Sequence, residues 1–191
     1  MVSAVQNLPL PSAYIQLLKE TQQNPRFHAE GSVYTHTCMV VSEVLAYAKN
    51  HSLSQEEKTI LYWTAVLHDI GKPTVTKWEH GRWRSPGHEM AGVNIAREIL
   101  SPQTDISPLQ KRIILDLIRW HHIPLRWGLK KKSIDTYKAL ATRIDLRLLG
   151  IFSLCDIKGR KCVDQERTIQ MIEYFIHFIA PAVQNELELL A

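Results

Sequence analysis

The sequence predicts an all-α protein that carries one small β-hairpin. Apolar residues recur at helical spacing along almost the whole chain, and each break between these segments is a proline, a glycine or a polar cluster. Only residues 74–85 have the composition of strands. Hydrophobic residues make up 45% of the 191 residues and charged residues 22%, which is the composition of a folded chain rather than a disordered one. At this length we expect a single domain, residues 1–191.

The helices are predicted from apolar periodicity and from the signals at their ends. Seven or eight are expected, over residues 14–18, 35–50, 54–69, 88–100, 108–121, 134–144, 145–158 and 165–179. The first ends before Asn24-Pro25. The third begins at a capping box, Ser54-x-x-Glu57, and Gly71 and Pro73 stop it.

Residues 74–85 predict the hairpin. Two short runs that contain Trp78 and Trp83 flank a His80-Gly81 turn. We expect the two tryptophans to pack against each other across the hairpin rather than to stack on a nucleotide base. The densest basic stretch, residues 126–132, is interpreted as a solvated loop rather than as a nucleic-acid contact.

Composition and charge limit the class of protein. The formal net charge is +4 and the isoelectric point is near 9.0, a mild basic excess that is compatible with a phosphate-bearing ligand. No apolar run reaches the ~18 residues of a membrane span. The first eleven residues lack Lys and Arg, so no secretory signal is expected. Cys38, Cys155 and Cys162 are odd in number and widely spaced, which favours reduced thiols and a cytoplasmic protein.

Histidine and aspartate side chains recur at the ends of the expected helices. His68 and Asp69 end an apolar helix and are followed at once by Ile70-Gly71-Lys72. Adjacent helical residues point about 100° apart, so both side chains can reach one ion only where the helix is ending. The other candidates lie far away in the sequence, also near helix ends: His36, His88, His121, His122 and Asp156. Such a distribution is typical of a site held between bundled helices.

These residue types predict a divalent transition metal. Neutral imidazoles with carboxylates and no thiolate suit Mn, Ni, Co, Fe or Zn, whereas an oxygen-ligated Mg or Ca site would not use this much histidine. Three or four protein ligands leave room for water, whose pKa a divalent ion lowers towards neutrality. Because an aspartate beside a histidine can bridge two ions, we expect one or two ions.

The order of these residues resembles the HD phosphohydrolase superfamily over roughly residues 30 to 165. The GHEMAG and DIKGR segments resemble segments of the HD domain of bacterial tRNA nucleotidyltransferases. The blocks NPRFHAEG, VYTHT, SPGH and DIKGR are similar to the HD phosphoesterase module of bacterial RNA-repair polynucleotide kinases. The kinase itself does not carry over, because Gly71-Lys72 has Val66 where a P-loop glycine belongs and Pro73 where Ser or Thr would hold magnesium.

The resemblance implies an HD helical bundle that hydrolyses phosphoesters of nucleotides or RNA ends, as a 2′,3′-cyclic phosphodiesterase or 2′-phosphatase. It implies that the metal ligands are His36, His68, Asp69 and Asp156, with His88 and His121 completing a second, weaker site. The expected catalytic residues are Asp69, Lys72, His88 and His121. Lys72, Arg160 and Lys161 are expected to contact substrate phosphate. His122 is either a further ligand or a residue that supports one, and His28, His51, His80 and His177 are interpreted as structural or surface residues.

Two alternatives remain open. The same ligands suit a hydrolase of free nucleotides, such as a deoxynucleotidase, a dinucleoside polyphosphate hydrolase or a signalling-nucleotide hydrolase. A module that binds RNA or a protein partner without catalysis is the lesser alternative, because no expected ligand is missing. The unit either stands alone or works with a separate RNA-repair kinase or ligase, and its oligomeric state is open.

Overall fold

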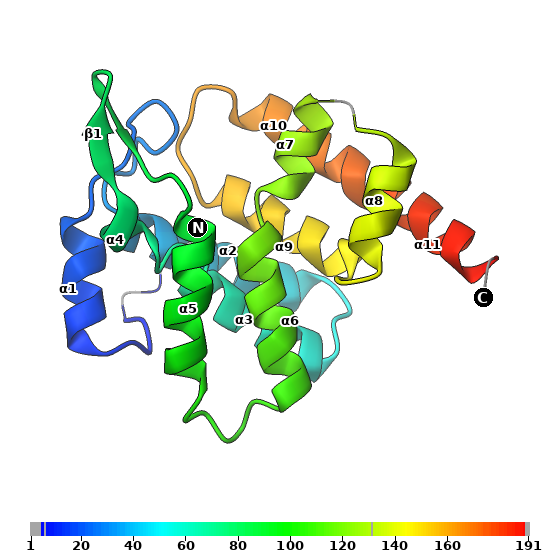
Figure 1. Cartoon of the computed structure of the whole chain (residues 1–191), viewed down its shortest axis with the longest axis horizontal. Helices are drawn as coiled ribbons and strands as arrows, with labels where there is room; N and C mark the ends of the chain where they lie inside the picture. The colour runs from blue at the N-terminus through cyan, green and yellow to red at the C-terminus, as the bar shows by residue number, and fades with distance from the viewer. Residues whose placement is uncertain (1–4, 6, 131, 190–191) are drawn as a thin grey trace.

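The protein is a bundle of helices with a two-stranded hairpin (Figure 1). A computed structural model of the chain describes residues 5, 7–130 and 132–189. The helices are Ser12–Glu20 (α1), Val33–Asn50 (α2), Gln55–Leu67 (α3), Lys72–Val75 (α4), His88–Leu100 (α5), Pro108–Trp120 (α6), Ile123–Leu129 (α7), Ile134–Ala141 (α8), Leu146–Lys158 (α9), Gln165–Tyr174 (α10) and Ala180–Glu188 (α11). The strands are Lys77–Glu79 (β1) and Arg82–Arg84 (β2). The predicted all-α class with one hairpin is confirmed.

The helix prediction missed three segments: α4, α7 and the separate α11. Each carries a proline in its first turn, where the missing N–H has no helical partner to lose. The sequence analysis interpreted these prolines as breaks. As a consequence, the basic stretch expected to be a loop is helical as far as Leu129. Lys131 in that stretch lies outside the described residues. A π-helical turn, Phe175–Ile179, joins α10 to α11.

Helix α9 forms the centre of the core. It is buried on almost every side, as expected for a helix that is apolar all round. Helices α2, α3 and α6 pack against it, α2 also packs against α3, and α5 packs against α6. In Figure 1 the hairpin stands at one end of this group, and α8 and α11 lie at the other. No helix among the described residues is both long and apolar enough to cross a membrane.

The hairpin has the register Lys77↔Arg84, Trp78↔Trp83 and Glu79↔Arg82. The turn residues His80 and Gly81 have φ values of 51° and 73°, the left-handed backbone that a two-residue hairpin turn requires. As expected, the rings of Trp78 and Trp83 contact each other, with their centroids 5.2 Å apart.

Two glycines allow helices to approach more closely than any side chain would permit. A Cβ atom on Gly71 would lie 2.3 Å from both the backbone nitrogen of Gly92 and the carbonyl oxygen of His88, in the first turns of α5. A Cβ atom on Gly159 would lie 2.8 Å from the backbone nitrogen of Val40 in α2. Gly71 therefore brings the end of α3 against the start of α5, and Gly159 brings the end of α9 against α2.

The contact at Gly71 predicts a destabilising effect of Gly71→Ala. The backbone φ of Gly71 is −82°, which alanine accepts, so the effect is steric. We expect the free energy of unfolding in urea to fall by about 1–3 kcal/mol, because two backbone segments must separate. The matched control is Gly128→Ala, whose Cβ would meet only the flexible end of Met171 at 3.2 Å. A loss of stability in the control equal to that in Gly71→Ala would contradict the explanation.

Candidate metal centre

The six residues predicted as metal ligands lie together inside the bundle, although up to 120 positions separate them. His36 lies in the first turn of α2, His68 is the C-cap of α3 and Asp69 follows it. His88 begins α5, His121 is the C-cap of α6, and Asp156 lies near the end of α9. All six side chains are buried. Metal ligation itself remains a prediction, and whether a cation fits depends on the atoms that these side chains bring together.

The histidine rings are held by their Nδ1 atoms. Three of them contact the carbonyl oxygen three residues earlier: His68 with Ala65 at 3.0 Å, His88 with Ser85 at 2.8 Å and His121 with Ile118 at 2.7 Å. Nδ1 of His36 lies 3.2 Å from the Gly159 carbonyl oxygen. A carbonyl oxygen can only accept, so each Nδ1 donates a proton. In a neutral imidazole, Nε2 is then left with a free lone pair, which is the ligating form.

The Nε2 atoms converge on carboxylate oxygens. Nε2 of His36 lies 3.0 Å from Asp156 Oδ1 and 3.3 Å from Nε2 of His68. Asp69 reaches in two directions: its Oδ2 lies 3.2 Å from Nε2 of His68, and its Oδ1 lies 3.4 Å from Nε2 of His88. Two atoms that bind one ion at about 2.1 Å are separated by about 3.0–3.4 Å in tetrahedral or octahedral geometry. The observed separations match this range.

Several of these atoms have no hydrogen-bond partner among the described residues. Asp69 Oδ1, His121 Nε2 and Asp156 Oδ1 are buried and lack one. Asp69 Oδ2 also lacks a well-directed hydrogen bond, although it lies 2.6 Å from Nζ of Lys72. Buried acceptors that face one another are unfavourable unless a cation or a proton lies between them. The donor set therefore fits a divalent ion.

The pKa shifts agree with this fit. Burial lowers the pKa of His121 to about 3, with a further contribution from neighbouring His68, so this ring is neutral. Burial acts to lower the pKa of His36, but the Asp156 and Glu30 carboxylates outweigh it and raise the pKa above its usual value, so these carboxylates favour positive charge here and a bound cation would displace the ring's second proton. Burial acts to raise the pKa of Asp69, whereas His68 and Lys72 bring it well below its usual range. The carboxylate is therefore ionised, as a metal ligand must be.

The donor atoms of the predicted ligands fall into two groups. The donor atoms of His36, His68 and Asp156 lie within 4.8 Å of one another, and so do those of His88, His121 and His122. The carboxylate of Asp69 contacts a member of each group. His122, whose role the sequence left open, places its Nε2 3.2 Å from Nε2 of His88. This is the arrangement expected of two neighbouring ions with Asp69 between them.

Of the three residues predicted to contact phosphate, two line a cavity beside the cluster and one is exposed outside it. Lys72 is buried, and its Nζ lies 2.6 Å from Asp69 Oδ2 and donates to Oε1 of Gln23 at 2.6 Å. Arg160 forms an ion pair with Asp156. Both line the cavity described below. The side chain of Lys161 is exposed and is not part of the cavity wall, so its contact with substrate remains only a prediction.

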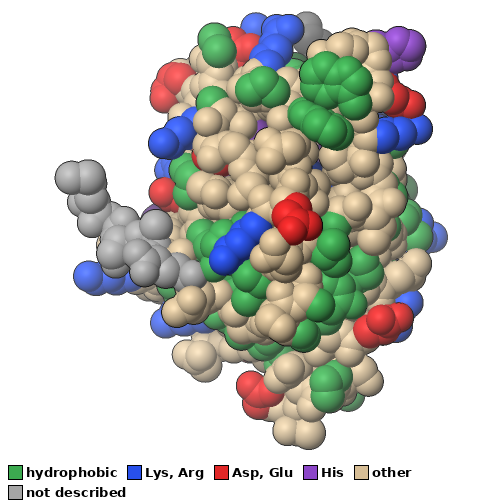
Figure 2. Space-filling view, turned by 90° about the vertical axis from the view of Figure 1, so that its left-hand side faces the viewer, with side chains coloured by type: hydrophobic (Ala, Val, Ile, Leu, Met, Phe, Trp, Pro, Cys, Tyr) green, Lys and Arg blue, Asp and Glu red, His purple; other side chains and the backbone are tan. Residues whose placement is uncertain are grey.

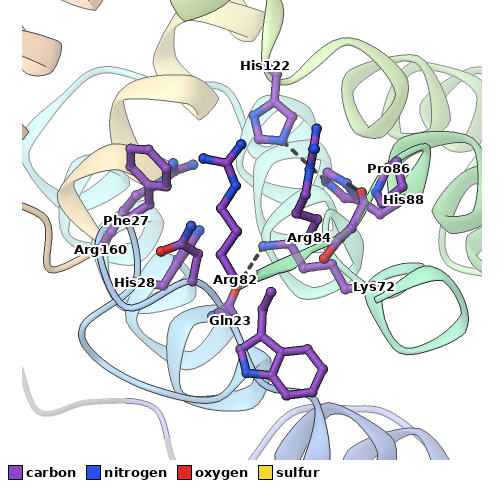
Figure 3. Close-up of a pocket in the computed structure, with 13 residues that line it drawn as sticks. Gln23, Phe27, His28, Lys72, Arg82, Arg84, Pro86, His88, His122 and Arg160 are labelled. Atoms are coloured by element: carbon purple, nitrogen blue, oxygen red, sulfur yellow. Dashed lines mark hydrogen bonds between the residues drawn. The ribbon is translucent and has the colours of Figure 1, made fainter. Parts of the chain in front are cut away.

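A cavity of about 420 Å³ opens beside the buried cluster (Figure 3). His88 and His122 form part of its wall. Among the described residues, the wall carries four cationic side chains and no carboxylate: Lys72, Arg82, Arg84 and Arg160. The remaining lining residues are Gln23, Asn24, Phe27, His28, Trp83, Ser85 and Pro86. A cavity with this composition attracts an anion.

Sequence reasoning missed residues that support the cluster from behind. Glu30 Oε1 accepts a hydrogen bond from Nδ1 of His28 at 2.9 Å and lies 3.1 Å from Nδ1 of His36. Its Oε2 accepts from the backbone N–H of Lys161 at 2.9 Å. A carboxylate behind a ligating histidine fixes the ring and raises its basicity. His28, which we expected to be structural or on the surface, instead lines the cavity. The available signal was the NPRFHAEG block, which lies outside any helix and has no periodicity.

Comparison with known proteins gives a family match and several relatives, among them two enzymes of the same name. Residues 33–156 match the HD domain. A bifunctional uridylyltransferase/uridylyl-removing enzyme of Cereibacter sphaeroides is 25% identical over 146 residues, which cover 67% of this chain and 14% of that protein. The enzyme of the same name from Ruegeria pomeroyi is 29% identical over 108 residues, 53% of this chain and 11% of that protein. The chain thus matches only a small part of these long relatives.

The position of Asp69 predicts that Asp69→Asn impairs binding at both groups. The amide keeps the size of the side chain but removes the charge and half of the lone pairs. We expect metal affinity, measured by equilibrium dialysis with elemental analysis, to fall more than about 100-fold, while circular dichroism retains the helical signal. Asp105→Asn, an exposed aspartate in a loop, is the control and should bind metal normally. Wild-type affinity in Asp69→Asn would contradict the assignment.

The second group predicts the number of ions. We expect wild-type protein to bind two, and His88→Ala to retain about one, because His36, His68 and Asp156 still form a complete group. Metal content per chain, determined on protein purified without chelator, measures this. His51→Ala serves as the control, since His51 stacks on Tyr47 at the surface. A His88→Ala protein that still binds two ions would assign His88 to substrate instead.

Proposed function

Because the chain belongs to the HD domain family of metal-dependent phosphohydrolases, we propose that it hydrolyses phosphoesters of nucleotides or of RNA ends. The narrower proposal is a 2′,3′-cyclic phosphodiesterase or 2′-phosphatase, and it rests on the sequence blocks that resemble the RNA-repair module. The relatives' names add support at the level of substrate class, because a uridylyl group is a nucleotide joined through phosphate.

One observation carries the proposal: the buried cluster reaches, through two histidines, the wall of a cavity whose charged side chains are all cationic. His88 and His122 belong both to the cluster and to the cavity wall. A phosphoester in the cavity would therefore lie between the metal ligands and the side chains of Lys72 and Arg160. Phe27 and Trp83 also line the cavity, and their rings offer surfaces on which a nucleotide base can stack.

Divalent ions held by His36, His68, Asp69, Asp156, His88 and His121 would lower the pKa of water and neutralise charge on the phosphate. Lys72 is oriented by two fixed partners, Asp69 and Gln23. Arg160 is oriented in the same way by Asp156. Their preorganised charges stabilise the negative charge that grows on the phosphate oxygens in the transition state.

The histidine pKa values bear on whether His88 and His121 act as metal ligands or as general acids. Burial is the main cause that lowers the pKa of His88 and of His121. A neutral imidazole is a good ligand but a poor proton donor near neutral pH. The ligand role of these two residues is therefore favoured over a role as general acid.

The substrate class is tested by assaying the protein loaded with Mn, Ni or Co. We expect hydrolysis of 2′,3′-cyclic AMP and adenosine 2′-phosphate, with these metals preferred over Mg because histidine ligands favour later transition metals. Deoxynucleoside monophosphates and dinucleoside tetraphosphates are assayed beside them, and Asp69→Asn is the inactive control. Cleavage of either of the latter substrates without cleavage of the cyclic ester would favour the free-nucleotide hydrolase. Failure on every phosphoester would favour the non-catalytic module.

A further inference from the structure

The cavity wall contains two arginines that the metal centre does not use, Arg82 and Arg84. They are two residues apart in β2, so their side chains leave the same face of the hairpin. Both line the cavity. Figure 3 shows them extending from the hairpin across the cavity in the direction of His122. Figure 2, which views the side of the molecule that carries α1 and the hairpin, shows Lys and Arg side chains beside hydrophobic ones at its upper end.

The positive charge of these arginines is only partly compensated within the hairpin, where Glu79 is the cross-strand partner of Arg82. Lys77 is the cross-strand partner of Arg84, and like charges directly opposite each other are destabilising. The carboxylate of Glu79 is paired with Lys77, at 2.8 Å. Among the described residues, neither Arg82 nor Arg84 forms a salt bridge with a carboxylate, whereas Lys72 is paired with Asp69 and Arg160 with Asp156. The unpaired charge of the cavity wall therefore lies on the hairpin.

The hairpin is fixed relative to the metal centre. At its base, the hydroxyl groups of Thr76 and Ser85 are hydrogen-bonded at 2.8 Å. The carbonyl oxygen of Ser85 accepts the hydrogen bond from Nδ1 of His88, at 2.8 Å. One residue thus orients a predicted metal ligand and directly follows the strand that carries the arginines. An anion bound by Arg82 and Arg84 would consequently have a set position relative to the reacting phosphate.

We propose that Arg82 and Arg84 form a subsite for a second phosphate group of the substrate, separate from the phosphate that is hydrolysed. The proposal deepens the proposed function and rests on it for the reacting phosphate. The ligand class is a nucleotide with at least two phosphate groups, either an oligonucleotide end with its next phosphodiester or a mononucleotide with an additional phosphate. Arginine suits this role because its planar guanidinium binds phosphate oxygens in pairs.

Binding is measured without hydrolysis, so that the test survives a failure of the proposed function. The protein is titrated with the dinucleotide pApA and with adenosine 5′-monophosphate, and tryptophan fluorescence gives each Kd. We expect wild-type protein to prefer pApA. The double variant Arg82→Ala/Arg84→Ala should reduce the ratio of the two affinities at least about tenfold. The slope of log K against log salt for pApA should also become shallower, by about 0.7 for each phosphate charge that the variant no longer neutralises.

The control is Arg97→Ala, which removes one arginine charge from a solvent-exposed position of α5 outside the cavity wall. It should leave the affinity ratio unchanged. A similar loss for both ligands in the double variant, or no loss for either, would overturn the second-phosphate subsite. Adenosine 5′-diphosphate distinguishes the two possible sources of the second phosphate. Binding as tight as that of pApA indicates a mononucleotide with an additional phosphate, and weaker binding indicates the next phosphodiester of an oligonucleotide. The protein could cleave no cyclic ester and still show the expected loss of preference for pApA in the double variant. In that case the proposed reaction is wrong and the second-phosphate subsite stands.

Discussion

The structure depends on one buried carboxylate, that of Asp69, which faces imidazole nitrogens on two sides. An anion and several lone pairs in a dry interior repel one another unless positive charge lies between them. Lys72 supplies part of that charge, and the remaining acceptors fit divalent ions. Five helix ends must meet for this arrangement to form. The close approaches at Gly71 and Gly159 allow two of these contacts between helix ends. The same contacts therefore determine both the packing of the bundle and the geometry of the cluster.

The predicted ligands lie at helix ends for a local physical reason. The last carbonyl groups of a helix have no partner within it. His68 and His121 each donate a proton from Nδ1 to a carbonyl near the end of their own helix, three residues earlier. One hydrogen bond therefore satisfies the helix end and selects the tautomer whose Nε2 can bind metal. A histidine in the middle of a helix would find that carbonyl already occupied, so the same orientation would be lost.

This local origin explains how much of the site could be predicted from the sequence. His68 and Asp69 can be recognised, because an apolar helix that begins at a clear capping box ends where they stand. Glu30 and His28 cannot, since they act from an irregular segment whose position depends on contacts with Lys161 and His36, far along the chain or in another element. The short helices α4 and α7 were missed for a different reason: a proline in the first turn interrupts the apolar pattern but is compatible with a helix beginning there.

The four cationic side chains of the cavity wall fall into two pairs, one tied to the buried cluster and one carried by the hairpin. Lys72 and Arg160 are each paired with a carboxylate of the buried cluster, so their positions are tied to the metal ligands. Arg82 and Arg84 belong to a three-residue strand that is linked to the cluster through the short connection from Ser85 to His88. On our proposal, substitution of the two arginine side chains would alter which ligand is held while the hydrogen bond from His88 to Ser85 stays in place. Since the ligand set suits many phosphoesters, selection among them has to come from such peripheral residues, and among the described residues the hairpin is the part of the cavity wall that carries unpaired charge.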